Sequence, residues 1–433
     1  MVVIEGGEAR GGKWEVGSLF VYPSFSIVPG LQRGRPQSTK AAMNTRHVFL
    51  ALCALPCLAQ AANTGSPFYG DPPDAHHPWA VHDQNRPQPV RVEPGTFSTQ
   101  EQPGKPPSDA IVLFGGQASD LDKWQADKKP AEPTKWEVKD GILQCVPKSG
   151  YIRTKEEFAD CQLHVEWSEP ADISGESQGR GNSGVFLMGH LEVQVLDNYN
   201  NPTYADGFAA SLYGVNPPMA NPLRKPGEWQ VYDIVFRKPV YKDGKELDAG
   251  YMTVFSNGVL VQDHTPLEGP GGHHNRSKTG PFPEKGPLKL QDHGNPVRFR
   301  NIWYRPLPKR TIEGATEGAL SEEATNAKRA EIAETVRADA AKLEGNAKTL
   351  RQLESLVYAT DAATLKEATG SVEAFVAAVK ALPADKLGSK KSDIMTFHNA
   401  LQYLTKAKDL PADFGATNEL ADIVKTQGWD KKK

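Results

Sequence analysis

Two short segments of the chain alternate aliphatic side chains with side chains that could do chemistry. The polar members of these segments, residues 191–195 and 288–293, are Glu192, Gln194, Lys289, Gln291 and His293. A β-strand sends successive side chains to opposite faces of its sheet. We therefore expect two strands side by side, with leucines and valines in a core. The carboxylate, carboxamides, ammonium and imidazole would line one face.

A carboxylate and an imidazole on one rigid surface can exchange protons with a bound molecule. Carboxamides bind hydroxyl groups, and an ammonium group stabilises developing negative charge. This combination favours a site that processes a sugar. Glu192 and Gln194 are the strongest candidates for site residues, because two polar side chains on a central strand are unexpected unless they have a function.

Residues 109–308 read as a succession of short strands separated by turn signals. Asp140-Gly141 and Asn257-Gly258 each stand between two apolar runs, which is the strongest short hairpin signal. A helical pattern of 10–15 residues does not separate the runs, which argues against a parallel α/β sheet. We predict a mainly β domain, an antiparallel sandwich or jelly roll.

Residues 318–430 have a different character. They are rich in Ala, Glu and Lys, and apolar residues recur at helical spacing between Pro383, Gly388, Pro411 and Gly415. We predict a small all-α helical bundle. It holds few histidines, no cysteine and no Gly-rich loop, so we interpret it as a packing module or a module that binds a protein partner.

The N-terminal part carries an export signal in an unusual place. Residues 43–61 combine a basic start, a short apolar stretch and an Ala-Gln-Ala cleavage site. We expect residues 1–42 to come from an over-extended start, and the protein to be exported to the periplasm or the medium. A genuine N-terminal extension before a buried apolar helix is the alternative.

Residues 62–108 form a Pro- and His-rich leader, either disordered or draped over the domain. Within it, His76 and His77 could bind a metal, but we favour a surface segment anchored by Trp79. After removal of the signal, Cys145 and Cys161 remain. An oxidising compartment permits a disulfide between them, although buried free thiols are the commoner outcome on such strands.

The overall charge excludes some partners. A formal net charge of −3 gives no basis for a nucleic-acid partner or an electrostatic membrane anchor. No apolar run approaches the roughly 20 residues that span a bilayer.

Several motifs in residues 109–306 are arranged as in one known family. They include Ile-Val-Leu-Phe-Gly-Gly at 111–116, Gly-Asn-Ser-Gly-Val-Phe-Leu at 181–187, Glu-Val-Gln-Val-Leu-Asp at 192–197 and Leu-x-Leu-Gln-Asp-His-Gly-Asn-Pro at 288–296. In this order, they resemble the 3-keto-disaccharide hydrolase domain family. The resemblance implies a concanavalin A-like (laminin-G-like) jelly roll with a concave sugar site, usually in exported bacterial proteins. It does not cover the helical tail.

The resemblance also implies a chemistry. In a sugar oxidised at C3, the C2 proton is acidic, so a base can remove it and the C1 oxygen leaves by elimination; water addition completes hydrolysis. The candidate bases are Glu192, His164 and His293. Lys289, Arg300 or a bound divalent metal could hold the enolate. Direct hydrolysis by two carboxylates, Glu192 with Glu166, is a second route.

Other polar and aromatic residues are candidates for substrate binding, namely Asn182, Tyr213, Trp229, Asp233 and Arg300. All but Asn182 have a structural alternative. Arg298 and Arg300 share one face, and we expect at least one of them to make a structural ion pair. Tyr213 and Trp229 could stack on a sugar ring or fill the core, and Asp233 could anchor a hydrogen bond. His164 and Glu166 could be the solvated face of an edge strand.

Two functions from other classes stay open at this point. A non-catalytic carbohydrate-binding module would need aromatics and amides on the concave face but no base. A cell-surface adhesion domain would use the helical tail for docking. The enzyme is the favoured hypothesis, with an oligosaccharide or glycoside as its substrate.

Overall fold

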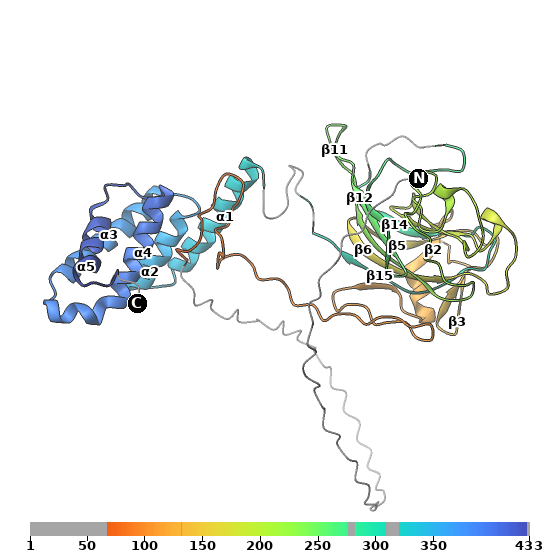
Figure 1. Ribbon diagram of the computed structural model, residues 1–433, viewed down its shortest axis with the longest axis horizontal. Coiled ribbons are helices and arrows are strands. Elements are labelled where there is room, and N and C mark those ends of the chain that lie inside the picture. The colour runs from red at the N-terminus through yellow and green to blue at the C-terminus, as the bar shows by residue number, and fades with distance from the viewer. Residues whose placement is uncertain (1–66, 131, 276–281, 309, 311–319, 431–433) are drawn as a thin grey trace, which may run out of the picture. The chain divides into compact units, whose positions relative to one another are not determined.

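The computed structural model describes residues 67–130, 132–275, 282–308, 310 and 320–430. The expected over-extended start and the export signal, residues 1–61, lie outside these ranges. Two kinds of structure follow one another along the described chain: antiparallel sheets, then helices (Figure 1).

The β-domain contains two main sheets. The larger sheet has eight strands: β1 (Ile111–Phe114), β3 (Glu137–Lys139), β4 (Ile142–Gln144), β6 (Cys161–Ser168), β9 (Gln230–Arg237), β12 (Tyr251–Ser256), β13 (Val259–Pro266) and β15 (Arg298–Pro306). The smaller sheet has five: β2 (Trp124–Ala126), β5 (Ile152–Phe158), β7 (Ser183–Leu187), β8 (Leu191–Val195) and β14 (Gly286–Leu290). A separate hairpin joins β10 (Val240–Lys242) to β11 (Lys245–Asp248).

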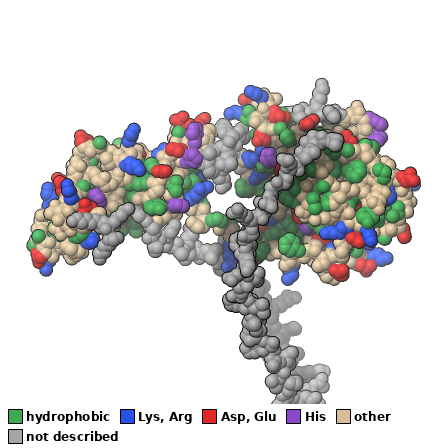
Figure 2. All heavy atoms as spheres, viewed as in Figure 1, with side chains coloured by type: hydrophobic (Ala, Val, Ile, Leu, Met, Phe, Trp, Pro, Cys, Tyr) green, Lys and Arg blue, Asp and Glu red, His purple; other side chains and the backbone are tan. Residues whose placement is uncertain are grey.

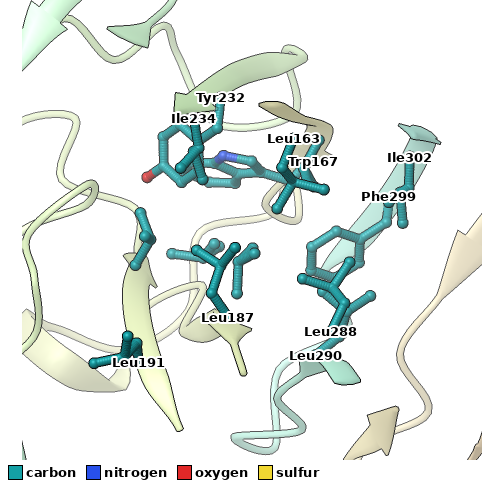
Figure 3. Close-up of a cluster of buried hydrophobic side chains, with 14 of the residues drawn as sticks. Leu163, Trp167, Leu187, Leu191, Tyr232, Ile234, Leu288, Leu290, Phe299 and Ile302 are labelled. Carbon is teal, nitrogen blue, oxygen red and sulfur yellow. The ribbon is translucent and has the colours of Figure 1, made fainter. Parts of the chain in front are cut away.

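Every strand pair of the described chain is antiparallel. The core lies between the two main sheets, where Leu163 and Trp167 of β6 face Leu187 of β7 and Leu290 of β14 (Figure 3). All four are essentially inaccessible to solvent. The predicted mainly β antiparallel sandwich is confirmed.

The turn signals also act as predicted. Asp140-Gly141 joins β3 to β4, and Asn257-Gly258 joins β12 to β13. Both residues of each turn have positive φ, from 50° to 80°, which is the left-handed conformation that Asn, Asp and Gly tolerate best.

One expectation about the sheet is wrong. The two polar strands do not lie side by side, because β7 stands between them in the order β14-β7-β8. Residues 183–187 are a strand of their own that turns directly into β8, so β8 pairs with its neighbour in the chain. The polar side chains of β14 and β8 still share one face, but they are two strand spacings apart.

The C-terminal part is helical. It comprises α1 (Glu322–Ala340), α2 (Gly345–Leu356), α3 (Ala362–Lys380), α4 (Lys391–Ala407) and α5 (Gly415–Thr426). Their apolar faces share a core that includes Val336, Leu353, Val376, Leu401 and Leu420. Ser321 caps α1, since its side chain accepts a hydrogen bond from the backbone N–H of Ala324. Among the described helices, none combines the length and the apolar character that crossing a bilayer requires.

The first half of the leader packs on the helices. Phe68 belongs to their core, and Trp79 packs edge-on against Tyr358 at the end of α2, at 6.4 Å between ring centroids. The hydroxyl of Tyr358 donates to the carboxylate of Asp83 at 2.8 Å and accepts from Asn85 Nδ2 at 2.7 Å. The helical unit is therefore built from chain segments on both sides of the β-domain in the sequence.

Acidic and basic side chains are interspersed on the face that Figure 2 shows, as the nearly balanced net charge leads one to expect. Cys145 and Cys161 are free and buried, and burial raises the pKa of both thiols. The structure therefore contains the favoured pair of free thiols and no bridge between them.

Candidate active site

A cleft of about 540 Å³ opens on the outer face of the smaller sheet, away from the core. Its walls carry amides, phenols, imidazoles and one carboxylate. The lining residues are Tyr151, Gln178, Asn182, Phe186, Glu192, Gln194, Tyr204, Tyr213, Gly271, Gly272, His273, Gln291 and His293. Six of the residues singled out from the sequence are among them: Asn182, Glu192, Gln194, Tyr213, Gln291 and His293.

The register of the strands sets the floor of the cleft. Glu192 lies opposite Phe186 on β7, and Phe186 lies opposite Lys289 on β14. In the next row, Gly184 pairs with Gln194 and accepts a hydrogen bond from the backbone N–H of Gln291 at 3.1 Å. Gly184 therefore separates the two glutamines.

Glu192 occupies the space that Gly184 leaves. A Cβ atom on Gly184 would lie 2.2 Å from Glu192 Oε1, so the carboxyl group lies over the backbone of β7. It makes no hydrogen bond to another described residue. Burial raises the pKa of Glu192 to about 8, and the nearby Lys289 ammonium opposes this rise only in part. At neutral pH the carboxyl group thus holds its proton.

The amides of the cleft are hydrogen-bonded to one another. Gln194 Nε2 donates to Gln178 Oε1 at 2.9 Å, and Asn182 Nδ2 donates to the backbone oxygen of Gln178 at 2.7 Å. Gln291 Nε2 donates to the hydroxyl of Tyr151 at 2.8 Å. The Oε1 atoms of Gln194 and Gln291 are buried and have no partner within the described chain.

Two tyrosines and a histidine from loop segments also line the cleft. The hydroxyls of Tyr204 and Tyr213 are 2.9 Å apart, and the Tyr213 hydroxyl is 3.4 Å from His273 Nδ1. Burial, reinforced by the contact with Tyr204, raises the pKa of Tyr213. His273 and His293 are exposed at the rim.

Lys289 lies beside the cleft and does not line it. Its ammonium is 5.4 Å from the ring centroid of Phe186 and 3.6 Å from a carboxylate oxygen of Asp127. Its charge is therefore shared between this ion pair and the surroundings of Glu192.

The other predicted site residues lie elsewhere. Glu166 and His164 on β6, Asp233 on β9 and Arg300 on β15 point outward from the larger sheet, on the far side of the core from the cleft. Since β6 pairs with β9 on one side and β15 on the other, it is a central strand. The interpretation of His164 and Glu166 as the solvated face of an edge strand is wrong.

These groups form an ionic network in which His164, Glu166 and Arg300 are buried and the side chain of Asp233 is 43% exposed. Glu166 accepts hydrogen bonds from Arg300 Nε at 2.7 Å and from Asn301 Nδ2 at 2.7 Å, while His164 Nδ1 is 2.7 Å from Asp233 Oδ1. Burial lowers the pKa of His164, but the carboxylates of Asp233 and Glu166 outweigh it and raise the value to about 9. The same cations and donors hold the pKa of Glu166 below its ordinary value against desolvation.

The second half of the leader covers this network. Ser98 donates to Glu166, and the backbone oxygens of Thr99 and Gln100 accept from the guanidinium of Arg300. Gln100 also exchanges two hydrogen bonds with the backbone of Trp229, at 2.6 and 3.0 Å. The ring of Trp229 faces the Arg300 guanidinium at 4.2 Å, where a sugar ring was expected.

Three predicted roles therefore need correction. His164 cannot be the base and Arg300 cannot hold the enolate in the cleft, because both belong to the covered network. Pairing Glu192 with Glu166 for direct hydrolysis is also wrong, since the two carboxyl groups leave opposite outer faces of the sandwich. The same placement puts Asp233 and Trp229 outside the cleft, and strand alternation alone could not reveal it, because both sheets have an outer face.

Sequence reasoning missed several residues of the cleft: Tyr151, Gln178, Phe186, Tyr204 and His273. Tyr204 and His273 lie on loops, where no periodic pattern marks them. The stretch Gly269-Pro270-Gly271-Gly272 before His273 was the available signal. Its glycines permit close approach, since a Cβ on Gly271 would lie 1.6 Å from the backbone oxygen of Tyr213.

Within the described ranges, no set of three or more His, Cys, Asp or Glu side chains gathers closely enough to hold a metal ion.

Comparison with known proteins places residues 109–305 in a family model described as the 3-keto-alpha-glucoside-1,2-lyase-like domain. Among solved structures, a protein from Parabacteroides distasonis ATCC 8503, provisionally described as a glycosyl hydrolase, is 44% identical, with a TM-score of 0.48. The match covers 51% of this chain and 93% of that protein. The comparison with curated proteins finds no match.

Two more distant structures also match. A second provisional glycosyl hydrolase from the same organism is 21% identical, with a TM-score of 0.32, over 46% of this chain and 94% of its own. A β-1,3-1,4-glucanase (lichenase) derived from a mouse hindgut metagenome is 13% identical, with a TM-score of 0.20, over 40% and 83%. The resemblance inferred from the motifs is confirmed: through its β-domain, the chain belongs to the 3-keto-alpha-glucoside-1,2-lyase-like domain family.

Proposed function

We propose that the β-domain cleaves 3-keto-glycosides, with the outer-face cleft as its active site and Glu192 as the central acid–base group. One observation carries this proposal: among the described residues, the cleft is lined by a single carboxylate, surrounded by groups that bind hydroxyls.

A single carboxylate fits poorly with direct glycoside hydrolysis. That reaction uses two carboxyl groups, about 5–9.5 Å apart, on either side of the glycosidic bond. A glycoside that already carries a C3 ketone needs less help, because its C2 proton is acidic. One acid–base carboxyl group and a second proton acceptor are then sufficient.

The reaction balances as follows. Removal of the C2 proton forms a C2–C3 double bond and moves the carbonyl electron pair onto the C3 oxygen. Return of that pair restores the ketone, forms a C1–C2 double bond and expels the C1 oxygen, which takes up a proton. Addition of water across the C1–C2 double bond completes net hydrolysis.

The cleft supplies the groups for these steps. Imidazole exchanges protons readily near neutral pH, and His273 and His293 bring two imidazoles to the rim. Glu192 holds its proton in the interior. The amides of Asn182, Gln194 and Gln291 suit a polyhydroxylated ring, and the description of the family supports the 3-keto specificity.

The test compares a 3-keto-disaccharide with its unoxidised parent. We expect the purified chain to release monosaccharide from the keto compound only, and deuterium to appear at C2 of the product in D₂O. Glu192→Gln should lose most of the activity. Glu157→Gln, an exposed carboxylate on β5 of the same sheet, is the matched control. Binding without release would assign the domain as a carbohydrate-binding module. If the chain shows no binding and no release, a carbohydrate function is rejected.

A further inference from the structure

We propose that the cleft recognises the segment HO–C–C(=O)–C–OH of a 3-ketopyranose through three groups in one row: the amide oxygens of Gln194 and Gln291 accept from the two hydroxyls, and Glu192 between them donates to the ketone oxygen. This inference rests on the proposed function and specifies how that site reads its substrate.

The row follows from the strand register. Gln291, Gly184 and Gln194 are neighbours across three strands, and the carboxyl group of Glu192 lies over Gly184, between the two glutamines. Two strand spacings separate the glutamine backbones by about 10 Å. A span of this size is on the scale of a six-membered ring with a hydrogen bond of about 2.8 Å at each end.

The amide oxygens are free to accept, whereas three of the four amide N–H groups already donate within the protein. Gln194 Nε2 is committed to Gln178 Oε1 and to the backbone oxygen of Gly207. Gln291 Nε2 is committed to the Tyr151 hydroxyl. Both Oε1 atoms are buried without a partner in the described chain. A buried acceptor without a donor is unfavourable, and a hydroxyl of a bound ligand relieves that cost.

The carboxyl group of Glu192, at the centre of the row, acts as a hydrogen-bond donor. A ketone oxygen can only accept, so it needs a donor at the position between its two neighbouring hydroxyls. Burial keeps the Glu192 carboxyl group protonated at neutral pH and so makes it a donor. The same hydrogen bond strengthens as charge develops on the C3 oxygen, which stabilises the enolate.

The pattern acceptor–donor–acceptor on the protein therefore complements donor–acceptor–donor on the sugar. A sugar that lacks either flanking hydroxyl would leave one amide oxygen unpaired. A sugar without the ketone would present a hydroxyl hydrogen toward the carboxyl proton of Glu192, or would have to turn it aside.

The experiment measures binding separately from cleavage. The probe is a 3-keto-α-glucopyranosyl C-glycoside, which has carbon in place of the leaving oxygen, together with its 2-deoxy and 4-deoxy analogues. Dissociation constants are measured for the wild type, Gln194→Met and Gln291→Met, since methionine keeps the length of the side chain and removes the acceptor together with the amide N–H groups; the deoxy analogues then isolate the contribution of the acceptor. Gln125→Met, on the same face of β2 but outside the cleft, is the control.

We expect each cleft variant to bind the parent probe about three- to tenfold more weakly, and the control to bind it as the wild type does. Each deoxy analogue should bind the wild type more weakly than the parent probe does. The variant that lacks the glutamine paired with the missing hydroxyl should bind that analogue and the parent probe equally. In the wild type, affinity for the ketone probe should also fall above pH ~8, where Glu192 loses its proton. Glu192→Gln retains an N–H donor and should remove this pH dependence.

Two results would overturn the inference. In the first, the deoxy analogues bind the wild type as tightly as the parent probe does. In the second, the affinity lost on removing a hydroxyl from the probe is the same in both variants as in the wild type. If the pattern holds but the corresponding O-glycoside is not cleaved, recognition stands and the proposed function fails. Cleavage without the pattern rejects the recognition alone, and absence of binding by the parent probe rejects both.

Discussion

The carboxyl group of Glu192 occupies the position where any residue other than glycine would place a Cβ atom at 184. That atom would lie 2.2 Å from Glu192 Oε1 and 2.8 Å from the ring of Phe186. The absence of a side chain at Gly184 is thus a condition for the carboxyl group to lie between Gln194 and Gln291, over the strand that joins them.

The first prediction concerns this contact. Gly184→Ala should lower kcat by at least about tenfold, because the added methyl displaces the end of the Glu192 side chain from its position. The melting temperature should change by only a few degrees, since the displaced atoms are the end of the Glu192 side chain and the edge of the partly exposed Phe186 ring. Gly179→Ala is the control, because a Cβ there meets nothing within 4 Å. Full activity in Gly184→Ala would show that the position of the carboxyl group is not critical.

The second prediction concerns pH. If the reaction needs the protonated carboxyl group of Glu192, kcat/KM should fall above pH ~8 with a single ionisation on that limb. The raised pKa also links folding to pH. The stabilisation from this proton is complete below the ordinary value of 4.5 and is lost as the pH rises through about 8.

Chemical denaturation from about pH 5 to about pH 9 checks the second part. The free energy of unfolding of the wild type should decline with pH more steeply than that of Glu192→Gln, which has no proton to lose. Parallel curves for the two proteins would contradict the assigned pKa. A shared decline is expected from Glu169, whose burial also raises its pKa to about 8.

The third prediction separates the ionic network from the cleft. Glu166→Gln leaves the buried Arg300 without its carboxylate partner, and breaking a buried pair in this way costs about 3–5 kcal/mol. The free energy of unfolding of the β-domain should fall by that order. The folded fraction should keep its activity, because the network lies across the core from Glu192. Glu157→Gln should change stability by less than about 0.5 kcal/mol. Loss of activity in folded Glu166→Gln would restore Glu166 as a site residue.

The fourth prediction concerns the leader and the helices. Tyr358→Phe removes the hydroxyl that Asp83 and Asn85 share, and should destabilise the helical unit by about 1–3 kcal/mol. Tyr403→Phe is the matched comparison: its buried hydroxyl has no partner in the described chain, so its loss should be neutral or slightly stabilising. Denaturation followed by the helical circular dichroism signal measures both. Equal effects would show that the leader contact contributes nothing.

Strand alternation predicted the outward direction of Glu192, Gln194 and Gln291 correctly, because the period of two follows from the backbone and depends on no other part of the chain. The two hairpin turns were predictable for a similar reason, since Asn-Gly and Asp-Gly meet a local conformational demand. The helices of the C-terminal part were equally visible in the spacing of their leucines and valines. The residues that begin and end these helices act on the backbone within a few positions, so they too are visible in the sequence.

The sequence by itself therefore determined the antiparallel class, the helical tail and the residues that turn away from the core. Only the tertiary structure decided which of two outer faces each polar strand presents, and that β7 separates β14 from β8. His164 and Glu192 share the same alternating pattern, yet one lies under the leader and the other in the cleft. The physical reason is that periodicity records burial on one side of a strand. The partner strand, and the segment that covers the other side, are fixed by contacts between residues far apart in the chain.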